Sequence, residues 1–183
     1  MTQASDFTLY SGGLRGAEAE FGTQAEKYGV AEVTFSYDGH KPDREKNVIV
    51  LSGADLDSGD VSMEIVSRRM GRNFPEAEKI RKVIQSIYHM VNRGFQVFSV
   101  GWIQADNTVK GGTGWGVELA KLFNRPVSVY DQDRNVWVTW TDNTWKADSP
   151  VIEHKTFCAS GTRYLSREAA LAIQDLFARS FEK

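Results

Sequence analysis

A glycine-rich segment near the middle of the chain constrains the fold most. Residues 111–121 read Gly-Gly-Thr-Gly-Trp-Gly-Val-Glu-Leu-Ala-Lys, and apolar, strand-like runs flank them at residues 95–103 and 126–130. A strand, a glycine-rich turn, a helix and a second strand form one parallel crossover unit. Such a turn lets the backbone approach a ligand and aims free N–H groups and the positive end of the helix dipole at an anion. The segment therefore predicts a parallel sheet with an anion-binding turn at its edge.

Two further turns of the same kind follow predicted strands. Residues 11–18, Ser-Gly-Gly-Leu-Arg-Gly-Ala-Glu, come after the strand-like run 7–10 and open a helix over residues 17–28. Residues 160–163, Ser-Gly-Thr-Arg, come after a short strand and precede a C-terminal helix that Ser166 caps. Because the carboxyl ends of parallel strands share one edge of a sheet, we expect the three turns to form one phosphate-binding crevice.

The rest of the chain also alternates between strand and helix patterns. Further strands are predicted at residues 32–37, 47–52, 127–130 and 136–140, a helix at 75–92, and connectors at 38–46, 52–60 and 145–153. Residues 61–70 are amphipathic, but the sequence leaves their secondary structure ambiguous. This alternation predicts an α/β fold, with a single Rossmann-like domain over residues 1–183. Its sheet is expected to be mostly parallel, with helices on both faces and a possible antiparallel hairpin at one edge.

Composition excludes several classes of function. The net charge of −2 and the pI of about 5.9 argue against general nucleic-acid binding and against binding to a membrane surface. The single cysteine, Cys158, excludes an intramolecular disulfide, and the three histidines lack metal-ligand spacing, so no metal site is predicted. No apolar run approaches ~20 residues and no signal pattern is evident, so we expect a cytoplasmic protein.

The glycine-rich segment resembles the second signature of the SLOG superfamily, which includes the Lonely Guy phosphoribohydrolases. Glu118 stands where those enzymes place a catalytic carboxylate, whereas Trp115 replaces their usual threonine. The segments 11–18, 117–121 and 125–127 are closer to the molybdenum-cofactor-carrier-like branch. Residues 157–163 resemble that branch's closing strand and turn, with Thr162 in place of proline. The resemblance fails over residues 40–92. It implies a Rossmann-like fold that binds a nucleotide or nucleotide derivative, commonly as a homo-oligomer, here a dimer or tetramer, with no required cofactor.

The predicted ligand-binding residues lie in the three turns and in the helix starts that follow them. They are Ser11, Gly12, Gly13, Arg15, Gly16, Glu18, Gly111, Gly112, Thr113, Gly114, Trp115, Gly116, Glu118, Gly161, Thr162 and Arg163. Both arginines suit phosphate, because a guanidinium offers paired donors, although each is also a candidate for bracing a loop. Trp115 is a candidate for stacking on a base or for packing against a helix. Glu18 and Glu118 are either ordinary helix-start acids or ligand contacts.

Three hypotheses about function follow. The first is a binding protein for a phosphate-containing nucleotide derivative, acting as a carrier, sensor or sequestering module. The second is a nucleotide N-glycosidase, in which Glu118 is the catalytic carboxylate that stabilises an oxocarbenium-like centre. The third is a non-catalytic assembly subunit. In phosphoribohydrolases an upstream arginine assists the glutamate, but the upstream arginines here form no recognisable arrangement. This difference, together with Trp115 in place of threonine, favours the binding protein over the glycosidase. These arginines are Arg68, Arg69, Arg72 and Arg81.

Overall fold

A computed structural model describes residues 3–182 of the chain, which form one eight-stranded sheet. The strands lie across the sheet in the order β3 (Ile49–Leu51), β2 (Ala31–Tyr37), β1 (Thr8–Ser11), β8 (Thr156–Gly161), β4 (Gln96–Gly101), β5 (Val127–Asp131), β6 (Val136–Thr141) and β7 (Thr144–Ala147). All pairs from β3 to β5 are parallel, and β6 and β7 add an antiparallel edge. The predicted α/β class, mostly parallel sheet and edge hairpin are confirmed.

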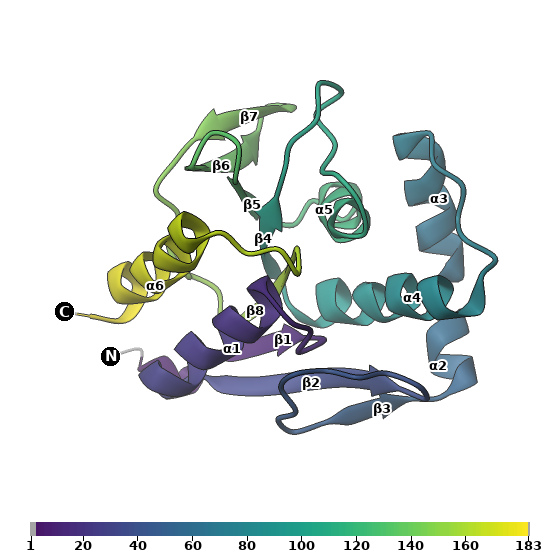
Figure 1. The fold of residues 1–183 in the computed structure, drawn as a ribbon, viewed down its shortest axis with the longest axis horizontal. Helices are drawn as coiled ribbons and strands as arrows, with labels where there is room; N and C mark the ends of the chain where they lie inside the picture. The colour runs from purple at the N-terminus through teal and green to yellow at the C-terminus, as the bar shows by residue number, and fades with distance from the viewer. Residues whose placement is uncertain (1–2, 183) are drawn as a thin grey trace.

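Helices cover both faces of the sheet, as Figure 1 shows. On one face, α1 (Ala17–Tyr28) and α6 (Arg167–Phe181) pack side by side; a short 3₁₀ turn, η1 (Ala4–Asp6), precedes β1. On the other face lie α4 (Glu78–Arg93) and α5 (Thr113–Leu122), while α2 (Gly53–Asp57) packs on α4 and α3 (Asp60–Met70) packs on α4 and α5. None of the helices in residues 3–182 is long and apolar enough to cross a membrane.

The alternation of side chains along the strands gives the sheet two cores. Leu9, Phe98 and Phe157 pack beneath α1 and α6, whereas Val97 and Cys158 face α4 and α5. The central strands β4 and β5 are buried along their whole length, which explains why both read as continuous apolar runs. The polar ends of these strands therefore emerge only at the edges of the sheet.

In four segments the structure differs from the sequence-based prediction or settles an ambiguity in it. The connector 52–60 contains α2, because the Ser52 hydroxyl accepts the Asp55 N–H while the Asp55 carboxylate accepts the Ser52 N–H. Residues 61–70 form a regular helix, α3, which ends at Gly71 in the left-handed region. Part of the predicted connector 145–153 is strand β7, which pairs with β6. The helix predicted from residue 75 begins at Glu78.

Candidate functional site

The three predicted turns meet at the carboxyl edge of the sheet, after the neighbouring strands β1, β8 and β4. The Ala17 N–H donates to the Thr162 carbonyl at 3.0 Å, which joins the first turn to the third. A Cβ on Gly16 would overlap the backbone of Thr162 and Arg163, so this approach requires glycine. On the other side of β8, a Cβ on Gly101 would lie 3.8 Å from the side chain of Thr113, at the start of α5. The expectation that the turns share one edge is confirmed.

The first turn already holds an anion that belongs to the protein. Glu18, on the first turn of α1, folds back so that its carboxylate accepts the Leu14 N–H at 2.9 Å, and the Gly12 backbone also stabilises its charged form. The Gly13 N–H donates to the Ser11 hydroxyl at 2.9 Å. These donors are therefore satisfied internally and are not free for a ligand in this structure.

Burial controls the acidity of Glu18. Its side chain is only 5% exposed, and burial raises the pKa of the carboxyl to about 7, against the opposing effect of the backbone hydrogen bonds. Burial, together with the nearby Glu18 charge, raises the pKa of Tyr37 to about 12 and also raises that of the Cys158 thiol. No lysine or arginine within residues 3–182 forms an ion pair with Glu18. A carboxyl group with a pKa of about 7 is partly protonated at neutral pH, so it can donate or accept a proton there.

The loop after β2 covers the back of the first turn. The N–H groups of Asp43 and Arg44 both donate to the Gly13 carbonyl, at 2.9 and 3.1 Å. The Arg44 guanidinium in turn pairs with Glu32 at 2.8 Å and with Glu26 at 2.9 Å. The polar loop 38–46 is a mostly exposed connector, as predicted, and it also braces the site because Arg44 pairs with carboxylates on α1 and β2.

The second turn keeps its donors open. Gly111 and Gly112 are exposed, and within the described chain the N–H groups of Gly112 and Thr113 have no acceptor. Arg72 fixes this turn by donating to the Gly111 carbonyl at 3.0 Å and to the Val109 carbonyl at 3.0 Å. A helix start with free N–H groups favours an anion. Of the glycine turns, the second therefore offers the unoccupied backbone donors.

Arg15 and Arg163 lie in the first and third turns, which contact each other through Gly16. Both side chains are exposed, and neither forms an ion pair or a side-chain hydrogen bond with any residue from 3 to 182. By contrast, Arg44 and Arg72 are each held by several acceptors. The first and third turns therefore each carry an exposed guanidinium group that forms no ion pair within residues 3–182.

Trp115 and Gly116 lie inside the protein rather than in the crevice. Trp115 is only 5% exposed, and its ring packs on Phe74 with a centroid distance of 5.8 Å. A Cβ on Gly116 would lie 3.1 Å from the Ile87 side chain, so this glycine lets α5 approach α4. Gly114 lies against the Val109 carbonyl, where a Cβ would overlap the oxygen. These three residues position α5, and none presents a side chain to a ligand at this edge.

Glu118 faces α3 and the edge hairpin. Its carboxylate pairs with Arg69 at 3.3 Å and with Lys121 at 3.3 Å, and the Lys121 ammonium lies 3.7 Å from the centre of the Trp140 ring. Of the four upstream arginines in the sequence, Arg69 is the one that forms an ion pair with Glu118 within residues 3–182. The 49 positions that separate it from Glu118 give no local signal of the pair.

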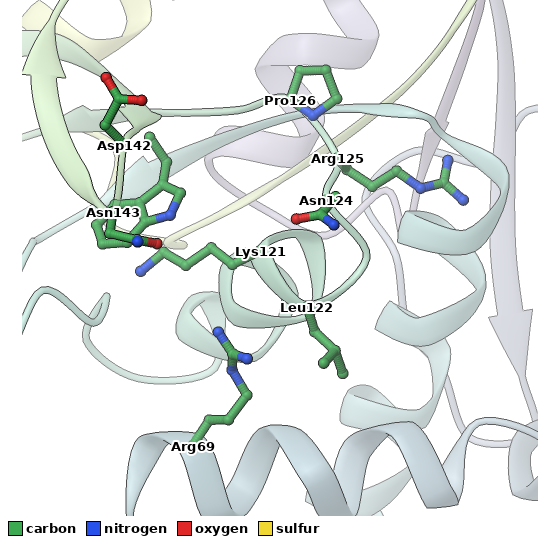
Figure 2. A pocket seen from close by; sticks show the side chains of 9 residues that line it. Arg69, Lys121, Leu122, Asn124, Arg125, Pro126, Asp142 and Asn143 are labelled. Carbon is green, nitrogen blue, oxygen red and sulfur yellow. The ribbon is translucent and has the colours of Figure 1, made fainter.

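The cations that pair with Glu118 line a different part of the surface. Figure 2 shows Arg69 pointing from one helix toward the helix that carries Lys121, whose side chain extends toward Asn143; both line an open depression of about 610 Å³. Its wall includes the connection Asn124–Pro126, which precedes β5, and the turn between β6 and β7. Both segments lie at the amino end of β5, whereas the glycine turns follow the carboxyl ends of the parallel strands. The two regions are linked through Lys121, which donates to the Asn107 carbonyl, in the segment before the second turn, at 3.1 Å.

Sequence reasoning missed two residues of the carboxyl edge. Trp102 directly follows β4, and Lys110 lies 5.9 Å from the centre of its ring, from the returning side of the segment 102–112. Both side chains are at least partly exposed. The available signal was an aromatic residue immediately beyond a buried central strand, but Trp102 reads as part of the apolar run 95–103.

The fold and the edge define a class: an α/β protein with a Rossmann-like sheet and polar, glycine-rich turns where its parallel strands end. Comparison of the chain with family models, with curated proteins and with solved structures finds no match in any of the three. The resemblance to the SLOG superfamily therefore stays a prediction. Within residues 3–182, no group of three or more His, Cys, Asp or Glu side chains is arranged to hold a metal ion.

Proposed function

We propose that this chain binds a phosphate-containing nucleotide or nucleotide derivative at the carboxyl edge of its sheet, as a carrier, sensor or sequestering module. The observation that carries the proposal is the pair of unpaired guanidinium groups, Arg15 and Arg163, in contacting turns. Guanidinium forks bind phosphate through two parallel hydrogen bonds. The free N–H groups of Gly112 and Thr113 add backbone donors on the other side of β8.

Binding without turnover is favoured by the position of Glu118. Two cations, Arg69 and Lys121, neutralise its buried carboxylate, and both of these cations line the depression rather than the glycine turns. A group that stabilises an oxocarbenium-like centre must lie against the sugar that the phosphate anchors. The recorded partners of Glu118 are Arg69 and Lys121, and none of the proposed phosphate donors contacts it, which supports binding without turnover.

The Arg69–Glu118 ion pair is the specific observation that favours the second candidate, a nucleotide N-glycosidase. That enzyme would need its substrate beside α3 and α5. Assay of base release from the common nucleoside monophosphates tests this candidate, with Glu118→Ala as the diagnostic variant. Release that Glu118→Ala abolishes while ligand affinity persists would establish the glycosidase instead of the binding protein.

The proposed binding is tested in two steps. Mass spectrometry of freshly purified, denatured protein identifies any co-purifying small molecule, and calorimetric titration with nucleoside monophosphates measures affinity. The double variant Arg15→Ala/Arg163→Ala should lose at least about tenfold in affinity, since each lost charge-assisted hydrogen bond contributes about 1.5–3 kcal/mol. Arg125→Ala, which removes a cation that lines the depression beside Arg69, is the control and should bind like the wild type. Equal affinity of the double variant and the control contradicts the proposal, and absence of any ligand favours an assembly subunit.

A further inference from the structure

Trp102 differs from the other tryptophans of the chain in having no core to pack against. The sequence contains five tryptophans. Trp115 packs on Phe74, Trp137 packs on Phe98 and Tyr130, and Trp140 and Trp145 pack on each other. Within the part of the chain that the structure describes, Trp102 belongs to neither hydrophobic core, and its ring pairs with no other aromatic ring. Its side chain is partly buried, and its recorded ring contact is with the Lys110 ammonium.

The backbone holds Trp102 in a fixed place. Its carbonyl accepts the Lys110 N–H at 2.9 Å, and the next residue, Ile103, forms an antiparallel bridge with Val109. The segment 102–112 is therefore a braced arm, which Figure 1 shows rising from the end of β4. These backbone bonds fix the position from which the Trp102 side chain projects. A residue that is already fixed loses less entropy when a ligand binds to it.

The position of Trp102 relates it to the unpaired cations. It is the first residue beyond β4, and β4 pairs with β8 so that the Val100 carbonyl accepts the Thr162 N–H at 3.0 Å. The third turn, with Arg163, thus starts beside the arm. The Lys110 ammonium lies near the Trp102 ring at 5.9 Å, within reach of a cation–π contact, and no carboxylate in residues 3–182 pairs with it.

We propose that Trp102 is the surface on which the planar base of the bound nucleotide stacks, while Lys110, Arg15 and Arg163 surround its phosphate. This inference rests on the proposed function, and it adds the part of the ligand that the glycine turns do not recognise. Stacking on an aromatic face accepts every base, because each base has a π-face. Trp102 therefore gives affinity for a heteroaromatic ligand and selects it over a phosphate without a base.

The test compares two probes on three proteins. The probes are the nucleoside 5′-monophosphate that the wild type binds best and ribose 5-phosphate, which has the same phosphate and sugar but no base. The proteins are the wild type, Trp102→Ala and the control Phe95→Ala, which removes an aromatic residue that is 38% exposed at the amino end of β4. Trp102→Ala should weaken the nucleotide by about tenfold or more and change ribose 5-phosphate less than about twofold. Phe95→Ala should leave both affinities unchanged.

A second variant keeps the test independent of folding. Trp102→Phe retains an aromatic face, so it should retain most of the nucleotide affinity while losing the quenching of tryptophan fluorescence that the nucleotide causes in the wild type. Equal nucleotide affinity in Trp102→Ala and the wild type would overturn the inference, as would an equal loss for both probes. If the wild type binds neither probe, the proposed function itself fails; if it binds ribose 5-phosphate as tightly as the nucleotide, only the stacking fails.

Discussion

Glu18 lies where the first glycine turn would otherwise receive a ligand's negative charge. The Leu14 N–H donates to its carboxylate, and burial holds the carboxyl pKa near 7. A folded-state pKa above the unfolded value of 4.5 means that the native protein binds this proton more tightly than the unfolded chain does. The free energy of unfolding that Glu18 contributes is therefore highest below pH 4.5 and falls as the pH rises to about 7.

Glu18→Gln should remove this dependence on pH. Each pKa unit corresponds to about 1.4 kcal/mol, so the wild type should lose about 3 kcal/mol between pH 4.5 and pH 8 relative to the variant. Urea unfolding at several pH values measures the difference, and the variant should be the more stable protein at pH 8. His40, whose pKa burial lowers, titrates in both proteins and cancels in the comparison. Parallel stability curves for the two proteins would show that Glu18 is not buried as described.

Gly16 makes the contact between the first and third turns possible. It has φ of +94°, and a Cβ there would overlap the backbone of Thr162 and Arg163. Gly16→Ala should therefore cost roughly 2 kcal/mol more than Gly39→Ala in a thermal or urea unfolding experiment. Gly39 is the matched control, because it also has positive φ, +86°, but nothing lies within 4 Å of its Cβ position. Equal losses would mean that the two turns do not touch.

At the scale of elements, Arg72 ties the connection after α3 to the arm that precedes α5. It donates to the Gly111 and Val109 carbonyls and to the side chains of Gln104 and Thr108, at 2.9 to 3.3 Å. Arg72→Ala should lower the free energy of unfolding by about 2 kcal/mol. It should also speed amide hydrogen exchange in residues 103–113 without changing exchange in α6.

Arg68 provides the control for this prediction. It lies one turn earlier on α3, is exposed, and pairs with no carboxylate in the described part of the chain. Arg68→Ala should leave both the stability and the exchange of the arm unchanged. If the two arginine variants behave alike, the arm is held by its own β-bridge and the anchoring role of Arg72 is wrong.

The sequence predicted best those helices and strands whose apolar residues or capping residues mark their bounds locally. The buried strands β4 and β5 read as apolar runs, and the helix that Ser166 caps begins where its cap indicates, with the Ser166 hydroxyl accepting the Ala169 N–H. Helix α2 was missed because it is five residues long and its stability depends on the Ser52–Asp55 capping box. Strand β7 was missed because its exposed residues carry no apolar alternation.

At the scale of the whole molecule, the sheet topology determined which features of the site could be predicted from the sequence. Three turns after parallel strands had to share one edge, and the structure confirms that they do. The direction in which each side chain points was not predictable, because it depends on partners far along the chain. Glu118 forms an ion pair with Arg69 on α3, and Trp115 packs on Phe74. The carboxyl edge of the sheet thus carries the predicted turns and arginines. The carboxylate of Glu118 and the ring of Trp115, which were also predicted there, point elsewhere.

The most direct test of the account is an amide chemical-shift titration of the labelled protein with nucleoside 5′-monophosphates. The account predicts that the largest shifts occur at Arg15, Gly112, Thr113 and Arg163, with the Trp102 indole moving as well. Resonances of Asn124 and Asn143, in the depression beside Arg69, should stay in place. Shifts confined to that depression would place the ligand there instead, and the proposed crevice would then be wrong.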